Sequence, residues 1–216
     1  MGGENVFLFV PNLIGYVRLL LAAVSFWLMP SRPVAASVCY GLAGLLDAVD
    51  GHAARLLGQG SRLGAMLDML TDRLSSMCLL LNLALLYPRW APALQLLSAL
   101  DVASHWLHMH WSTLQGAESH KAVGGEGHPL LRRYYQSRPL LFLLCAGSEA
   151  FYCCLYLLYW GEGPALFPGG PGLARAGLWL SAPVAALKTF LNILQLGGAL
   201  RGVASLDAAE RARKCG

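Results

Sequence analysis

The sequence predicts an all-α, polytopic membrane protein with about six transmembrane helices behind a short N-terminal helix in the membrane interface. Apolar residues make up 56% of the 216-residue chain and charged residues only 13%. This balance is unusual for soluble domains, and the mean hydropathy is positive. The apolar residues also form repeated runs long enough to cross a hydrocarbon core about 30 Å thick. We therefore expect a single membrane domain over residues 1–216.

The first expected element is ENVFLFV at residues 4–10, which is amphipathic but too short to cross the membrane. No cleavable signal peptide is expected, because Pro11, Asn12 and Arg18 interrupt the first apolar run. Pro- and Gly-rich breaks separate the spans that follow. These spans are expected near Asn12–Met29, Val34–Arg55, Gly64–Tyr87, Pro92–His110, Leu140–Trp160 and Leu173–Leu200.

An even number of spans places both termini on the same side of the membrane, and the basic residues indicate which side. On the side of the termini lie Arg55, Arg62, Lys121, Arg132, Arg133, Arg138, Arg201, Arg211, Arg213 and Lys214, against Arg32, Arg89 and Arg175 opposite. The positive-inside rule therefore predicts cytosolic termini, with a basic tail over about residues 201–216. This bias also accounts for the net charge of +4 without a nucleic-acid partner.

Four carboxylates, Asp47, Asp50, Asp68 and Asp72, lie in or beside apolar segments, where ionisable groups are costly and usually functional. Their spacings of three and four residues place each pair on one helical face. A loop of about eight residues predicts that the two helices pack antiparallel and bring the pairs together. Such a cluster needs a cation, and carboxylate ligands favour Mg²⁺ or Mn²⁺. Because Mg²⁺ usually shares its ligands with substrate phosphates, the cluster predicts a phosphorylated ligand.

Several residues beside the carboxylates fit a phosphorylated ligand. Gly51, Ala54 and Gly64 are small enough to let a helix or a nucleotide approach closely. Arg55 lies about two turns beyond the first aspartate on roughly the same face, where its guanidinium could pair with a phosphate. Ser61, in the connecting loop, could contact the nucleotide.

In order, Asp47, Asp50, Gly51, Ala54, Arg55, Gly64, Asp68 and Asp72 match every fixed position of the motif D-x2-D-G-x2-A-R-x8-G-x3-D-x3-D. This is the motif of the CDP-alcohol phosphotransferases, which the chain therefore resembles. The segments VPNLIGYVR, NLALLYP, LDVASHWLHMH, ESHK and SRPLLFLLCAGSEAFYCCLYL are similar to the eukaryotic, inositol-using branch of that family. One departure is Gly15, where many members carry Thr.

The resemblance implies transfer of the phosphatidyl group of CDP-diacylglycerol to myo-inositol, giving phosphatidylinositol and CMP. It implies a two-metal site of Mg²⁺ or Mn²⁺ in which Asp47, Asp50 and Asp68 are ligands. Asp72 completes the metal site and acts as the general base. The same donor chemistry with another alcohol, glycerol phosphate or serine, is the alternative.

The resemblance carries three further expectations. Gly51, Arg55 and Ser61 match positions that hold the CDP moiety of the lipid donor. Similar enzymes are homodimers of the endoplasmic reticulum membrane. The terminal RKCG, with basic residues third and fourth from the end, is similar to a dilysine retrieval signal.

The acceptor pocket is predicted from polar residues that share a face of one apolar segment. Asp101 and His105 are one turn apart and are expected to bind inositol, because a neutral polyol needs several donors and acceptors. A sugar phosphate would instead call for clustered basic residues. The alternative for both residues is interhelical hydrogen bonding that holds the bundle together. For Glu149 and Lys188, which are further candidates, a structural role is the stronger expectation.

Two other classes of function fit the sequence less well. A transporter would also place acids inside a helical bundle, but paired internal repeats with broken helices are not evident. A non-catalytic membrane scaffold would have no use for aspartates in this register.

Overall fold

The computed structural model describes residues 5–115 and 129–215, and the described elements are helical apart from an isolated bridge between Ala165 and Gly172. In order they are η1 (Val6–Leu8), α1 (Val10–Leu28), α2 (Pro33–Leu56), α3 (Arg62–Leu86), η2 (Pro88–Trp90), α4 (Ala91–Leu114), α6 (Pro129–Gln136), α7 (Arg138–Trp160) and α8 (Leu173–Cys215). The segment ESHK and Lys121, used above for the resemblance and the orientation, lie outside the described residues.

Five helices, α1, α2, α3, α7 and α8, are long and apolar enough to cross a membrane. The other expected span is α4, whose 24 residues are also long enough at about 1.5 Å per residue. It is less apolar because it carries Asp101 and several histidines. Large apolar side chains such as Trp27, Leu85 and Leu180 are about 80% exposed, as expected for side chains that face lipid. The prediction of an all-α, polytopic membrane protein is confirmed.

Both ends of the chain differ from the expected elements. The N-terminal interfacial helix is shorter than expected, a single 3-10 turn at Val6–Leu8, because α1 already begins at Val10 with Pro11 in its first turn. The last helix is longer than expected and continues to Cys215, so the basic tail is helical. Ala and Arg are the most frequent residues at the end of this helix and have high helix propensity.

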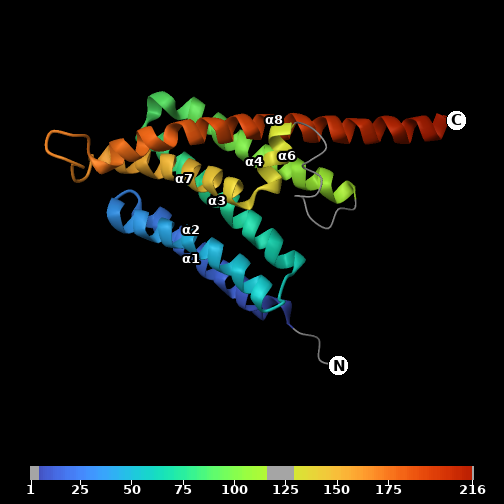
Figure 1. Ribbon diagram of the computed structural model, residues 1–216, viewed down its shortest axis with the longest axis horizontal. Helices are drawn as coiled ribbons and strands as arrows, with labels where there is room; N and C mark the ends of the chain where they lie inside the picture. The colour runs from blue at the N-terminus through green and yellow to red at the C-terminus, as the bar shows by residue number, and fades with distance from the viewer. Residues whose placement is uncertain (1–4, 116–128, 216) are drawn as a thin grey trace.

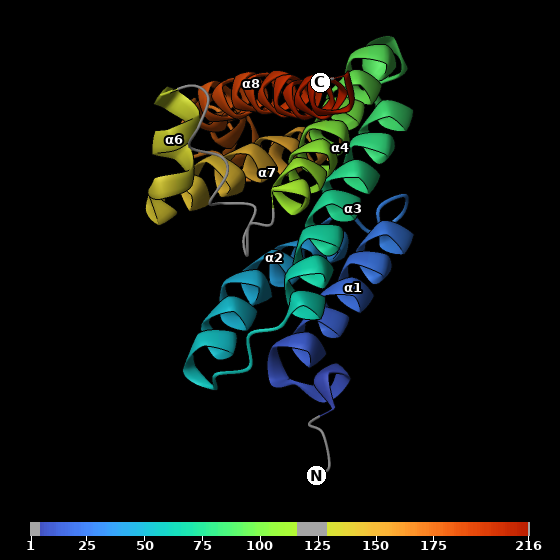
Figure 2. The ribbon, with the colours of Figure 1, turned by 90° about the vertical axis from the view of Figure 1, so that its right-hand side faces the viewer.

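The helices form two groups that are joined by α3. Helices α1 and α2 lie together, in blue in Figure 1, and α7 and α8 pack on each other with α4 beside them. Helix α3 contacts α1 on one side and α4 and α7 on the other, as the turned view in Figure 2 shows. The buried side chains that hold the groups together are Met29, Ala36, Tyr40, Leu79, Leu80, Leu83, Ala84, Leu94, Tyr152 and Tyr156.

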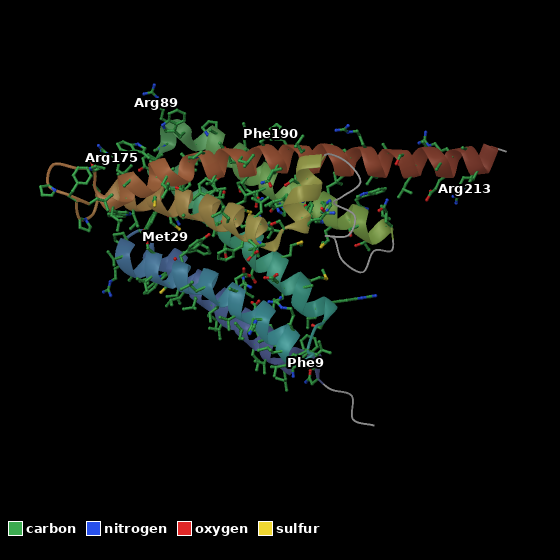
Figure 3. The ribbon with its side chains drawn as sticks, viewed as in Figure 1. Phe9, Met29, Arg89, Arg175, Phe190 and Arg213 are labelled. Carbon is green, nitrogen blue, oxygen red and sulfur yellow. The ribbon has the colours of Figure 1, made fainter. Side chains whose placement is uncertain are left out.

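The ends of the helices alternate along the long axis as an even number of spans requires. Figure 3 places Phe9, at the start of α1, and Arg213, near the end of α8, toward one end. Met29, after α1, and Arg175, at the start of α8, lie toward the other. The start of α1 and the end of α8 therefore lie toward the same end of the bundle, as expected.

The expected direct packing of α2 against α3 is wrong, although the two helices bring their aspartates together as expected. Among the described residues, α1 packs along both helices, whereas α2 and α3 make few contacts with each other. Gly15 of α1 allows this, since a Cβ there would lie 2.8 Å from Leu67 Cδ2 of α3. The physical reason is that α1 packs along both helices and its Arg18 binds aspartates of each, so the two helices meet across α1.

Candidate active site

Three of the predicted metal ligands meet in space. Asp47 and Asp50 project from α2 and Asp68 from α3, and each offers an oxygen within 4.8 Å of the oxygens of the other two. Asp50 is buried, whereas the side chain of Asp68 is about half exposed. The set contains only carboxylates, the ligands that hard divalent cations prefer. These residues therefore fit a site for a metal ion, as the sequence predicted.

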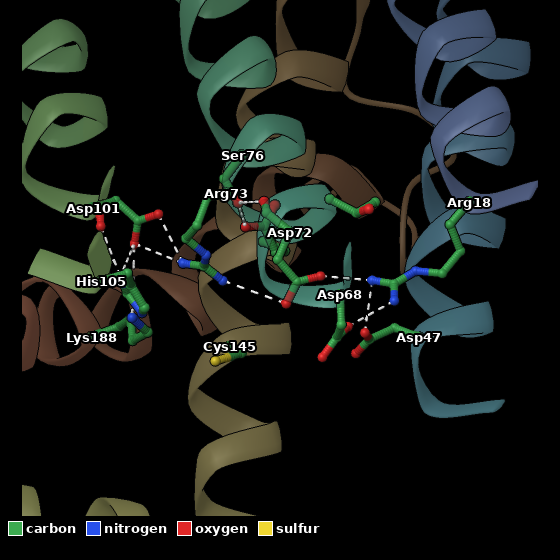
Figure 4. A network of polar contacts seen from close by, with 12 residues as sticks. Arg18, Asp47, Asp68, Asp72, Arg73, Ser76, Asp101, His105, Cys145 and Lys188 are labelled. Carbon is green, nitrogen blue, oxygen red and sulfur yellow. Dashed lines mark hydrogen bonds and ion pairs between the residues drawn. The ribbon is translucent and has the colours of Figure 1, made fainter. Parts of the chain in front are cut away.

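Arg18 of α1 reaches the centre of this cluster (Figure 4). Its Nη1 donates to Asp50 Oδ2 at 2.6 Å and to Asp68 Oδ1 at 2.8 Å. Its Nη2 lies 2.7 Å from Asp47 Oδ1 and donates to Asp72 Oδ1 at 2.7 Å. All four carboxylates thus converge on one positive charge, which supports the fit of the site to a cation. The guanidinium also compensates their mutual repulsion.

Asp72 differs from the other three aspartates because it is not part of the three-carboxylate group. Its second oxygen, Oδ2, lies 3.6 Å from Nη2 of Arg73, the next residue in α3. Asp72 and Asp47 line one cavity, and Asp50 and Asp68 line another. The aspartate cluster therefore separates two cavities, and Asp72 faces only the first.

The smaller cavity, about 240 Å³, contains every residue expected to hold the nucleotide: Gly51, Arg55 and Ser61. Ser61 caps the N-terminus of α3, where its Oγ accepts a hydrogen bond from Gly64 N at 2.9 Å. Gly51 has no close neighbour except Arg55, whose Nη1 would lie 3.6 Å from a Cβ. The cavity thus offers open space beside a guanidinium and the aspartates.

Asn12 closes one wall of this smaller cavity. Its side chain is buried, and its Nδ2 donates to the Val6 carbonyl at 2.6 Å. Its Oδ1 has no hydrogen-bond partner within the described part of the chain. A Cβ at Gly64 would lie 2.7 Å from this oxygen. Glycine at position 64 is therefore required for α1 and α3 to approach as closely as they do.

The larger cavity, about 360 Å³, lies between Asp72 and the polar face of α4. Asp101, predicted to bind the acceptor, lines it. His105 is not among the described lining residues, and its Nδ1 lies 2.7 Å from the Asp101 carbonyl oxygen. Of these two predicted acceptor residues, the structure brings Asp101 to the cavity wall and places His105 behind it.

Glu149 forms a second polar wall of the larger cavity. Its Oε2 accepts a hydrogen bond from the Tyr40 hydroxyl at 2.7 Å, and its Oε1 accepts one from Ser76 Oγ. These contacts join α7 to α2 and α3 across the cavity. Its carboxylate is accordingly held in place by neutral hydroxyl groups.

Sequence reasoning assigned no site role to Arg18 or Arg73, and for Lys188 it favoured a structural role over one in the acceptor pocket. Arg18, Arg73 and Lys188 all line the larger cavity. The signal was present, since each is an isolated cation in an apolar helix, where ionisable residues mark functional sites. Spacing could not reveal the contacts of Arg18, because its partners lie 29 to 54 residues away on other helices.

Comparison with known proteins agrees with this geometry. The family model for CDP-alcohol phosphatidyltransferase matches residues 8–160. The CDP-diacylglycerol–inositol 3-phosphatidyltransferase of Rattus norvegicus is 59% identical over 214 residues, which cover 99% of this chain and 100% of the relative. The human protein of that name is equally similar, and that of Saccharomyces cerevisiae is 41% identical over 95% of this chain and 90% of its own length. The chain belongs to the CDP-alcohol phosphatidyltransferase family.

Proposed function

We propose that the protein transfers the phosphatidyl group of CDP-diacylglycerol to myo-inositol, releasing CMP and forming phosphatidylinositol. The observation that carries this proposal is the aspartate cluster between two cavities, one with the nucleotide-binding residues of the motif and the other lined by polar groups. Relatives that are 59% identical over 99% of the chain carry this activity in their names.

The smaller cavity binds the CDP part of the donor. Gly51 leaves room for the diphosphate, Arg55 pairs with its charge, and Ser61 contacts the nucleotide. Asp47, Asp50 and Asp68 would hold a pair of Mg²⁺ or Mn²⁺ ions. When bound, these ions would stabilise the negative charge of the diphosphate.

The larger cavity binds the acceptor, and Asp72 acts there as the general base. Its carboxylate accepts the proton of one inositol hydroxyl, whose oxygen forms a bond to the lipid-side phosphorus. The bond from that phosphorus to the CMP oxygen breaks, and CMP leaves with its electron pair. Asp101 contacts the inositol directly. His105, which lies beside Asp101, is the second acceptor residue.

The setting of the enzyme follows from the resemblance and the charge bias of the loops. Residues 1–216 form one domain in the endoplasmic reticulum membrane, and both termini lie in the cytosol. The protein assembles as a homodimer. Epitope tags at the N-terminus and the C-terminus test the orientation, because both must be accessible after selective permeabilisation of the plasma membrane. Access to only one tag would contradict it.

The experiment that tests the activity uses purified protein in detergent with CDP-diacylglycerol and Mg²⁺. We expect CMP release with myo-inositol and none above background with serine. Glycerol 3-phosphate is the more informative comparison, because Arg73 and Lys188 in the larger cavity could favour a phosphorylated acceptor. Faster release with glycerol 3-phosphate than with inositol would overturn the proposal in favour of that alternative.

Replacing Gly64 with Ala is expected to weaken binding of the donor. The added Cβ would press on Asn12, which cannot yield easily because it is buried and bonded to the Val6 carbonyl. We expect KM for CDP-diacylglycerol to rise roughly tenfold, about 1.4 kcal/mol of binding. Gly198→Ala is the matched control, since nothing lies within 4 Å of a Cβ there. An unchanged KM in the Gly64 variant would contradict the assignment of the smaller cavity.

A further inference from the structure

Two basic side chains line the cavity that is proposed to take an uncharged acceptor. Arg73 projects from α3 and Lys188 from α8, and both face the larger cavity. Lys188 is 4% exposed, so its ammonium group is withdrawn from bulk water. A pair of largely buried cations is the usual arrangement for binding a phosphate, and not for binding a neutral polyol. Some other feature must therefore set the charge of this cavity.

Asp101 of α4 lies between these two cations. Both of its carboxylate oxygens accept hydrogen bonds from Arg73 Nη1, at 2.8 and 3.0 Å. Its Oδ1 lies 3.9 Å from Lys188 Nζ and accepts a further hydrogen bond from Asn192 Nδ2 at 2.9 Å. Figure 4 shows Asp101, Arg73 and Asp72 in one line of contacts that leads to the aspartate cluster.

The charges in this part of the larger cavity balance. Away from the aspartate cluster, the charged lining residues are Arg73 and Lys188 against Asp101 and Glu149, so two positive charges meet two negative ones. Glu149 is bonded to the hydroxyls of Tyr40 and Ser76. Asp101 is therefore the carboxylate that pairs directly with both cations, whereas Glu149 contributes to the net charge.

We infer that Asp101 is a specificity-determining residue, because it pairs with Arg73 and Lys188 and, together with Glu149, keeps the acceptor cavity electrically neutral. An uncharged polyol can enter such a cavity without the free-energy cost of desolvating a net charge. It can then form hydrogen bonds with the remaining donors and acceptors of the cavity. A phosphorylated alcohol must compete with a carboxylate that is already paired with both cations. This inference rests on the proposed function, because it concerns selectivity among acceptors of the same transfer.

The purely structural alternative is that Asp101 only links helices, since its partners lie on α3 and α8. The two roles predict different results for Asp101→Asn, which keeps the shape of the side chain and removes its charge. Loss of a link lowers thermal stability and leaves acceptor selectivity unchanged. Loss of the compensating charge leaves Arg73 with only its longer contact to Asp72 and Lys188 with only the neutral Asn192, and so creates a site for phosphate.

The test measures CMP release by the full-length protein in detergent, with myo-inositol as acceptor and myo-inositol monophosphate as inhibitor. The quantity compared is the ratio of the inhibition constant to KM for inositol. We expect Asp101→Asn to lower this ratio roughly tenfold, as one additional charge-assisted hydrogen bond would. The double variant Asp101→Asn with Lys188→Gln removes one cation and should restore most of the original ratio.

Glu149→Gln is the matched comparison, because it removes the same charge from the same cavity at a residue bonded to neutral hydroxyls. An equal fall in the ratio for Glu149→Gln, or no recovery in the double variant, would overturn the role of Asp101. An unchanged ratio in Asp101→Asn, with wild-type protein active on inositol, would also overturn it. Inactivity of the wild type on inositol would instead contradict the proposed function.

If Asp101→Asn does not give folded protein, Lys188→Gln in the wild-type background provides the second measurement. It leaves a net negative charge in the cavity, so inhibition by inositol monophosphate should weaken at least threefold relative to KM for inositol. No weakening would overturn the inference.

Discussion

Asp72→Asn is expected to lower kcat for CMP release roughly 10³-fold, within the range that a positioned general base contributes. The amide keeps the size of the side chain but cannot accept the proton of the inositol hydroxyl at neutral pH. The neighbouring Arg73 and the rest of α3 remain in place, so binding of the donor should change little. The measurement is the initial rate of CMP release at saturating CDP-diacylglycerol and inositol.

Two comparisons distinguish a general base from a metal ligand at Asp72. Stabilisation against heat by Mg²⁺ should persist in Asp72→Asn and be lost in Asp50→Asn, since Asp50 belongs to the three-carboxylate group. Asp207→Asn, an identical change on the exposed end of α8, should leave turnover unchanged. Near-normal turnover in Asp72→Asn would exclude Asp72 as the base.

Arg18→Met is expected to make the fold depend on divalent metal. Without the guanidinium, the four carboxylates lose the cation that they share, and only Asp72 keeps a contact with Arg73. This should lower the free energy of unfolding by about 3 kcal/mol in EDTA. We use the lower end of the range for buried pairs because Asp47, Asp68 and Asp72 side chains are 35 to 49% exposed. For a chain of this size the midpoint of thermal unfolding should fall by about 6 to 12 °C.

Adding Mg²⁺ should restore most of the stability of Arg18→Met, because the ion binds the folded carboxylate cluster and replaces the lost charge. Arg175→Met provides the control, since it also removes an arginine from an ion pair, with Glu162 at 2.5 Å. That pair is exposed, so its loss should cost less than about 1 kcal/mol and should not respond to Mg²⁺. Equal, metal-independent losses in the two variants would contradict the central position of Arg18.

The spans and the aspartate motif could be predicted because both are local properties of the chain. Apolar runs bounded by Pro and Gly determine where α1, α2, α3, α7 and α8 lie, with ends within a few residues of those expected except at the C-terminal tail. The spacings in the motif place Asp47 with Asp50, and Asp68 with Asp72, on single helical faces. They do not determine which other helix packs against those faces.

Sequence alone therefore determined the fold class, the family and the residues of the aspartate cluster. Only the tertiary structure decided that α1 packs between α2 and α3, that Arg18 joins the four carboxylates, and that Arg73 and Lys188 meet Asp101 in the larger cavity. The physical reason is that an isolated charge in an apolar helix must find a partner, but the partner lies on another helix. Asp101 from α4 meets Arg73 from α3 and Asn192 from α8, so its role depends on how three helices pack.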